Sequence, residues 1–265
     1  MDRQKMPLEE IRLYQLHARS AAYQRRLRQA HEIVRKALEQ ARRPMVACSW
    51  GKDSTVTLHL VWSQKPDIEV IFCDRSTEGG GELPETYEII EKWKRRYNLT
   101  VHRAIPEITL IDILKSMNGF GDGDMQRTKS LVRREITIGP ADRLREELGG
   151  DALFLGLRAE ENPLSRGLHM RFHGPIYRKK SGLLQVCPIG WWTAKDVWAY
   201  IVDNGLPYHP IYDKTMFETR EEIRQSNWAG GFVDWKNGHW SKIRYYYPEL
   251  WRLIVEEVPT IAQFN

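Results

Sequence analysis

One polar loop constrains this sequence more than any other feature. It lies between an apolar stretch, 44–48, and a helix-like stretch, 55–62. The loop consists of Ser49, Trp50, Gly51, Lys52, Asp53, Ser54 and Thr55. A strand that turns into a helix through such a loop directs backbone N–H groups and the positive end of the helix dipole at one point. The pattern therefore predicts a phosphate-binding site and a chain that handles nucleotides.

This loop differs from the common GxxxxGK[ST] phosphate loop. Only Gly51 precedes the lysine, and Asp53 separates Lys52 from the two hydroxyl residues that follow. It resembles the SGGxDS loop of the N-type ATP pyrophosphatases, with Trp50 in place of the first internal glycine. The resemblance implies cleavage of ATP between its α- and β-phosphates. It also implies a pyrophosphate cradle made of Ser49, Gly51, Ser54 and Thr55.

The same resemblance gives roles to the two charged residues of the loop. Lys52 is expected to neutralise phosphate charge, and Asp53 to bind Mg²⁺, a hard cation that prefers oxygen ligands. The alternative is a polar turn that merely caps a helix.

The loop belongs to a longer alternation of strands and helices. Apolar strand-like runs occur at 44–48, 68–74, 99–104 and 151–156, and helix-like segments separate the first three. This order predicts an α/β fold whose parallel sheet is flanked by helices. Ligands of such folds bind beyond the carboxyl ends of the strands.

The segments outside this alternation suggest a division into three parts. Residues 1–43 form an N-terminal helical arm, since 8–41 contains no glycine or proline and predicts one long helix or two abutting ones. We expect the arm to pack along the core or against a second subunit, which would make a homodimer. The nucleotide domain spans 44–214, and residues 215–265 form an aromatic-rich, helical extension.

Composition limits the setting and the chemistry. No apolar run is long enough to cross a bilayer and no signal peptide is evident, so the sequence predicts a cytoplasmic protein without a membrane partner. The three cysteines, Cys48, Cys73 and Cys187, lie far apart, without zinc or iron–sulfur spacing. The net charge is +5, with basic clusters in the N-terminal arm, at 127–134 and at 158–180. These clusters fit either DNA binding or solvated helix faces.

Four segments in order resemble the 3′-phosphoadenylylsulfate (PAPS) reductase-like branch of the adenine nucleotide α-hydrolase superfamily. The resemblance implies a Rossmann-like α/β fold. The segments are 49–55; 72–74 with 82–87; 156–161 with Ser165 and Arg166; and 188–212.

The resemblance also implies further site residues. Asp74, Arg75 and Ser76 would receive the adenosine. Gly156 ends a strand at the site, and Arg158 and Arg166 would contact phosphate or sulfate oxygens in the bidentate manner of arginine. Glu161 would orient one of these arginines, assist a metal, or form a structural ion pair. The catalytic candidates are Lys52, Asp53 and Arg158.

Two differences from the motifs of this branch limit which activity the sequence predicts. No cysteine follows Cys187, and the region that carries paired cysteines in cluster-binding members reads Asp124–Lys129 here, so thiol-based reduction is not expected. The favoured hypothesis is an ATP pyrophosphatase that uses ATP and Mg²⁺ to adenylylate an acceptor for sulfur transfer. Such an enzyme resembles the component of DNA phosphorothioation systems, with a cysteine desulfurase and other sulfur-modification proteins as partners. Two alternatives stay open. One is sulfate activation, as in the small subunit of sulfate adenylyltransferase, and the other is a subunit that senses nucleotides or binds nucleic acid without turnover.

Overall fold

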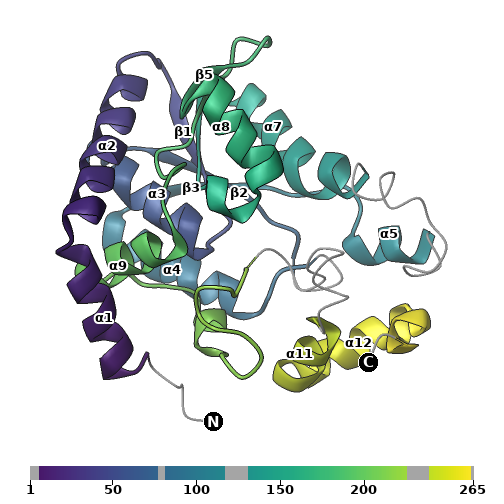
Figure 1. Ribbon diagram of the computed structural model, residues 1–265. Helices are drawn as coiled ribbons and strands as arrows, with labels where there is room; N and C mark the ends of the chain where they lie inside the picture. Colours follow the sequence, from purple (N-terminus) through teal and green to yellow (C-terminus); the bar gives the residue numbers. More distant parts are fainter. Residues whose placement is uncertain (1–5, 77–80, 117–130, 226–238, 264–265) are drawn as a thin grey trace. The chain divides into compact units, whose positions relative to one another are not determined.

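The computed structural model describes residues 6–76, 81–116, 131–225 and 239–263. Its centre is a six-stranded sheet in the order β3-β2-β1-β4-β6-β5 (Figure 1). The strands are β1 (Pro44–Ala47), β2 (Glu69–Cys73), β3 (Thr100–Ala104), β4 (Ala152–Leu155), β5 (Ile176–Arg178) and β6 (Leu184–Val186). The first four strands occupy the four runs expected from the sequence, so the α/β prediction is confirmed.

The last two strands add an antiparallel edge to an otherwise mostly parallel sheet. β1 pairs in parallel with β2 and β4, and β4 pairs in parallel with β6, whereas β5 and β6 are antiparallel. Gly182, at φ +88°, lies in the connection between them. Strands of three residues, one of them ending in Arg178, carry too little apolar pattern to be recognised in the sequence.

The sheet order places a switch point beside β1. The chain leaves β1 through α3 (Lys52–Trp62) to β2 on one side, while β4 pairs with β1 on the other side. Ala47 and Leu155, the last residues of β1 and β4, are register partners. Ligands of doubly wound sheets bind outside the carboxyl ends of the strands at such a point.

The chain divides into two compact units. The first comprises Met1–Phe72, Tyr87–His102 and Arg145–Gln225. It contains α1 (Leu8–Ala18), α2 (Ala21–Leu38), α3, most of α4 (Glu85–Tyr97), α8 (Leu168–His173) and α9 (Ala194–Asp203), with the short helices η2 (Ala159–Glu161), η3 (Pro163–Gly167) and η4 (Pro210–Asp213).

The second unit comprises Cys73–Thr86, Arg103–Leu144 and Ser226–Asn265. Its elements are α5 (Leu110–Ser116), η1 (Arg133–Thr137), most of α7 (Ile138–Glu147), α11 (His239–Tyr246), α12 (Pro248–Glu257) and η5 (Pro259–Gln263). Within this unit α12 packs against α5, α11 and η5. Among the helices described here, none is long and apolar enough to span a bilayer.

The N-terminal arm is two helices rather than one. The first ends at Ala18 with Arg19 as its C-cap, and Ser20 caps the second, because its hydroxyl accepts a hydrogen bond from the Tyr23 N–H. In the first unit, α1 packs on α9 while α2 packs on α3 and β6. Tyr23 and Val34, both fully buried, belong to the same hydrophobic core as Val46 of β1 and Phe154 of β4.

A buried carboxylate clamps this arm to α9. Asp196 has no exposed surface, and its Oδ1 accepts hydrogen bonds from His17 Nε2 and Arg26 Nη2, both at 2.8 Å. Its Oδ2 accepts from the Thr193 N–H at 2.7 Å and so caps α9. Burial alone would raise the pKa of Asp196, but the hydrogen bonds from Arg26, His17 and Thr193 outweigh it and hold the pKa below its usual value.

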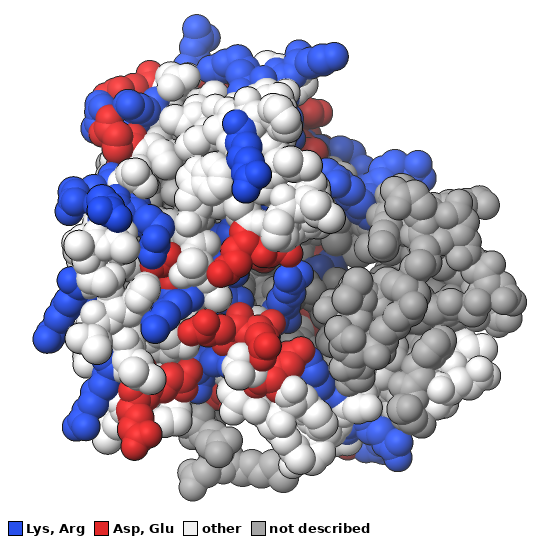
Figure 2. Space-filling view, viewed as in Figure 1, with Lys and Arg blue, Asp and Glu red and all other residues white. Residues whose placement is uncertain are grey.

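The clamp changes the interpretation of the basic arm. Arg26 is committed to Asp196, and Arg35 is paired with Glu32 and Glu39 on its own helix. On the face drawn in Figure 2, blue Lys and Arg side chains alternate with red Asp and Glu side chains instead of merging into one basic surface. Both observations favour a solvated helix face over a phosphate-binding arm. Arg127 and Lys129 of the second basic cluster lie outside the described residues.

Replacing Asp196 with Ala should lower the free energy of unfolding at pH 7 by about 3–5 kcal/mol, because two partners lose a buried counter-charge. The difference from wild type should be largest above about pH 4, the pKa range of an unfolded Asp, and should vanish as pH falls through the folded pKa. Urea unfolding from pH 7 to pH 2 measures it. The control Glu39→Ala, which breaks an exposed pair with Arg35, should cost less than about 1 kcal/mol. A cost for Asp196→Ala that does not change with pH would contradict the ionic clamp.

Candidate functional site: a phosphate loop at the switch point

The loop between β1 and α3 has the backbone of a phosphate site. Gly51 is the N-cap of α3 and has no side chain to cap the first N–H groups of the helix. Trp50 adopts φ +63°, in the left-handed region that glycine enters without strain. Its ring has no exposed surface and lies in the hydrophobic core, where it meets Phe72 edge-on with 6.2 Å between ring centroids. The bulk of Trp50 is therefore accommodated in the core.

The hydroxyl residues of the loop hold its shape. Ser54 Oγ and Thr55 Oγ1 each donate to the Gly51 carbonyl at 3.0 Å. Ser49 Oγ lies 3.4 Å from Ser54 Oγ. Thr55 is 1% exposed, so its hydroxyl supports the turn from inside, whereas Ser49 is exposed.

Lys52 is held by two residues, Tyr212 and Ile223, that lie far from the loop in the sequence. Its side chain is 3% exposed, and Nζ donates to the Ile223 carbonyl at 3.0 Å and lies 3.5 Å from Asp53 Oδ2. Its backbone N–H donates to the Tyr212 hydroxyl at 2.9 Å. Tyr212 lies in the last of the four family-like segments, 188–212. The sequence analysis therefore included Tyr212 but did not predict its contact with the phosphate loop.

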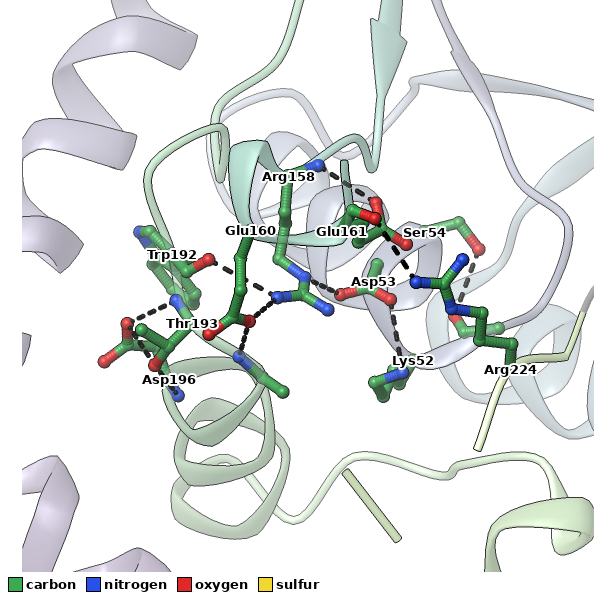
Figure 3. A network of polar contacts seen from close by, with 12 residues as sticks. Lys52, Asp53, Ser54, Arg158, Glu160, Glu161, Trp192, Thr193, Asp196 and Arg224 are labelled. Carbon is green, nitrogen blue, oxygen red and sulfur yellow. Dashed lines mark hydrogen bonds and ion pairs between the residues drawn. The ribbon is translucent and has the colours of Figure 1, made fainter. Parts of the chain in front are cut away.

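Arg158 connects the loop with the end of β4 (Figure 3). It is 3% exposed, and its Nε donates to Asp53 Oδ1 at 2.5 Å. Burial alone would lower the pKa of Arg158, but the charge and hydrogen bond of Asp53, with the nearby Glu161 and Glu160, raise it above its usual value. Asp53 is thus placed between two cations, Lys52 and Arg158.

Two glutamates position Arg158. Glu160 pairs with its guanidinium and also accepts the Ala194 N–H at 2.7 Å, which connects Arg158 to the start of α9. Glu161 accepts the Arg158 backbone N–H at 3.2 Å and pairs with Arg166. Glu161 thus forms an ion pair with Arg166, and its three expected roles stay predictions, while the contact of Glu160 with Arg158 was missed.

Gly156 permits this assembly. A Cβ on Gly156 would lie 2.7 Å from the Asp53 carbonyl and the Ser54 nitrogen, closer than real Cβ atoms approach. The absence of a side chain lets the end of β4 touch the first turn of α3. The expected residues Ser49–Thr55, Gly156, Arg158, Glu161 and Arg166 all lie in the first unit.

The three expected adenosine residues lie in the second unit, just beyond β2. Asp74 is 2% exposed, donates its N–H to the Ala104 carbonyl at 2.9 Å, and accepts from Arg103 at 2.5 Å. Ser76, at φ +61°, donates its N–H to Asp74 Oδ1 at 3.0 Å. Arg75 forms a buried pair with Glu82, which the sequence analysis did not single out. Burial raises the pKa of Glu82, and Arg75 only partly opposes this.

Metal ligands and reactive thiols are scarce among the described residues. Within them, no three His, Cys, Asp or Glu side chains are grouped to hold a metal ion. Asp53 nevertheless suits Mg²⁺, which takes one or two protein carboxylates when substrate phosphates supply further oxygens. Burial raises the pKa of Cys48 and Cys187 to about 12 and that of Cys73 to about 11. All three thiols are therefore protonated and unreactive near neutral pH.

A strand–loop–helix turn at the switch point of a mostly parallel sheet, with a buried lysine and arginine beside it, is the arrangement of a nucleotide-binding α/β domain. The model of the phosphoadenosine phosphosulfate reductase domain matches residues 43–244. The chain belongs to this family.

Curated relatives carry a sulfur-related name. The adenosine 5′-phosphosulfate reductase of Anoxybacillus flavithermus is 31% identical over 202 residues, covering 70% of this chain and 79% of that protein. The enzyme of the same name from Geobacillus kaustophilus is 34% identical over 197 residues, covering 69% of this chain and 78% of that protein.

Solved structures agree on the fold. The phosphate complex of Candida auris PAPS reductase superposes with a TM-score of 0.56 and 22% identity, covering 86% of this chain and 98% of that one. The U34-tRNA thiolase of Methanococcus maripaludis, with its [4Fe-4S] cluster, superposes with a TM-score of 0.52 and 15% sequence identity. The match covers 91% of this chain and 80% of that one. Both likenesses concern the fold alone.

Replacing Gly156 with Ala should push the β4 end away from α3, cost about 1–3 kcal/mol of stability, and weaken nucleotide binding. Thermal unfolding and nucleotide titration measure the two effects. Gly167→Ala is the matched control, since a Cβ there meets only ordinary contacts of 3.7–3.9 Å. Unchanged stability and affinity in Gly156→Ala would show that the close approach is not required.

Proposed function

We propose that this protein is an ATP pyrophosphatase that transfers the adenylyl group of ATP to an acceptor and releases pyrophosphate. The observation that carries the proposal is the placement of Lys52, Asp53 and Arg158 at the N-terminus of α3, whose N-cap residue Gly51 has no side chain. Two buried cations, held on either side of Asp53 at a helix terminus, offer fixed positive charges to a polyphosphate. The likeness of the loop to SGGxDS favours cleavage between the α- and β-phosphates.

Catalysis would come from positioning and from charge stabilisation. An acceptor oxygen attacks the α-phosphorus, the bond to the bridging oxygen breaks, and pyrophosphate leaves with the charge. Lys52, Arg158 and the N–H groups of α3 stabilise the negative charge that develops on the phosphate oxygens. Bound Mg²⁺, with Asp53 as its protein carboxylate, would neutralise further charge on the phosphates. Glu160 and Glu161 keep Arg158 in position.

The names of the relatives favour a second candidate, the reduction of adenylyl sulfate. That reaction needs an electron source, and in a thiol mechanism a thiolate that attacks sulfur. The raised pKa values of Cys48, Cys73 and Cys187 argue against any of them in that role. The cysteines therefore favour adenylyl transfer.

The acceptor and the partners belong to the same proposal. Adenylation makes an oxygen into a good leaving group, so sulfur supplied by a cysteine desulfurase can then displace AMP. A phosphate oxygen of the DNA backbone is the proposed acceptor. Because Arg26 is bound to Asp196, DNA contacts would have to come from other basic residues.

ATP incubated with the protein and Mg²⁺ should yield AMP and pyrophosphate, which anion-exchange chromatography resolves. Lys52→Ala and Asp53→Ala should each reduce turnover by about 100-fold, because each removes one preorganised electrostatic contact. Circular dichroism checks that the variants are folded, and Lys65→Ala, beyond the other end of α3, is the control. ADP and phosphate as products would rule out the pyrophosphatase. Sulfite released from adenylyl sulfate would favour the second candidate.

Replacing all three cysteines with Ala should leave pyrophosphate release within a few-fold of wild type, since none is a thiolate near neutral pH. The release rate is measured in a coupled phosphate assay. If a folded triple variant releases no pyrophosphate, a mechanism that uses a cysteine thiol would be favoured instead.

A further inference from the structure

The side-chain amide of Gln225 is buried beside the phosphate loop and has no hydrogen-bond partner among the described residues. Gln225 is 7% exposed, and within the part of the chain that the structure describes, neither its Nε2 nor its Oε1 forms a hydrogen bond. A methyl group added to Gly51 would lie 3.5 Å from Oε1 and 3.2 Å from the carbonyl oxygen of Gln225. The amide thus packs on the residue that caps α3.

The segment that carries Gln225 is held against Lys52. The Gln225 N–H interacts with the hydroxyl of Tyr212, which also accepts the Lys52 N–H. Ile223, two residues earlier, accepts Lys52 Nζ through its carbonyl. The segment 212–225 therefore forms one wall of the site, and the amide of Gln225 is held in that wall at a cost to the ligand-free protein.

The charge of the site indicates what the missing partner is. Lys52 and Arg158 lie next to the N-terminus of α3 and share one counter-charge, Asp53; two fixed cations at a helix N-terminus attract a phosphate group. An amide adds a neutral N–H donor to such a site without changing its charge, and phosphate oxygens accept such bonds. An anion at this place would satisfy a donor that the protein leaves unpaired.

We propose that Gln225 binds the nucleotide, with its side-chain N–H donating to a phosphate oxygen held at the N-terminus of α3. This assignment rests on the proposed function only in requiring a nucleotide phosphate at the loop. It adds a ligand contact from outside the four family-like segments, on a wall that Tyr212 and Ile223 fix against Lys52.

The test compares Gln225→Leu and Gln225→Glu with wild type by calorimetric titration with ATP and by thermal unfolding without ligand. Gln225→Leu should weaken ATP binding about 10- to 100-fold, the range for a hydrogen bond to a charged group. Its melting temperature without ligand should be unchanged or higher, because a buried unpaired amide is removed. Gln225→Glu should bind ATP more weakly still, since its carboxylate repels phosphate. The control Gln64→Leu, whose amide contacts His31 beyond the other end of α3, should bind as wild type does.

Each result decides the assignment. Wild-type affinity in Gln225→Leu, with or without a lower melting temperature, overturns it and makes the amide structural. If wild type binds adenylyl sulfate but not ATP, the proposed function fails, and the same titration with adenylyl sulfate then decides the role of Gln225. A wild-type protein that binds neither nucleotide overturns both.

Discussion

The contact between the ends of β1 and β4 is the constraint on which the site depends. The two strands are parallel neighbours, so the loop after β1 and the turn after β4 leave the sheet at one edge. Gly156 removes the side chain that would separate them. Arg158 can therefore reach Asp53 across 105 residues of sequence, and Glu160 extends the connection to α9. A wider separation of the two strand ends would disconnect all of these groups.

The charges of the site are stable only as a set. Lys52 and Arg158 are almost completely buried, and an unpaired charge in such a place is costly. Asp53 supplies the counter-charge in the protein without ligand, together with the Ile223 carbonyl on Lys52. The cations are thereby fixed in position before any ligand arrives. Fixed charges need no reorganisation when a phosphate group reacts, which is the physical basis of electrostatic catalysis.

Trp50 shows how the protein tolerates a departure from its family. The left-handed backbone at this position costs a residue with a Cβ about 1–2 kcal/mol relative to glycine. Burial of the indole offsets this cost, since a fully buried aromatic side chain stabilises the folded state by about 2–3 kcal/mol. The substitution therefore keeps the loop conformation and moves the additional volume into the core. A sequence comparison detects the exchange but not the direction of the ring.

The sequence by itself determined the strand–loop–helix turn after β1, the parallel α/β class and the residues that follow each strand, because these depend on local patterns of apolar, glycine and hydroxyl residues. It also left open one helix or two in the N-terminal arm, and it indicated that thiol-based reduction is not expected. Only the tertiary structure decided that Arg158 pairs with Asp53, that Arg26 is held by Asp196, and that Tyr212 and Gln225 line the loop. These contacts join residues far apart in the chain, and no local pattern encodes them. They arise from strand order and close packing, which are properties of the whole fold.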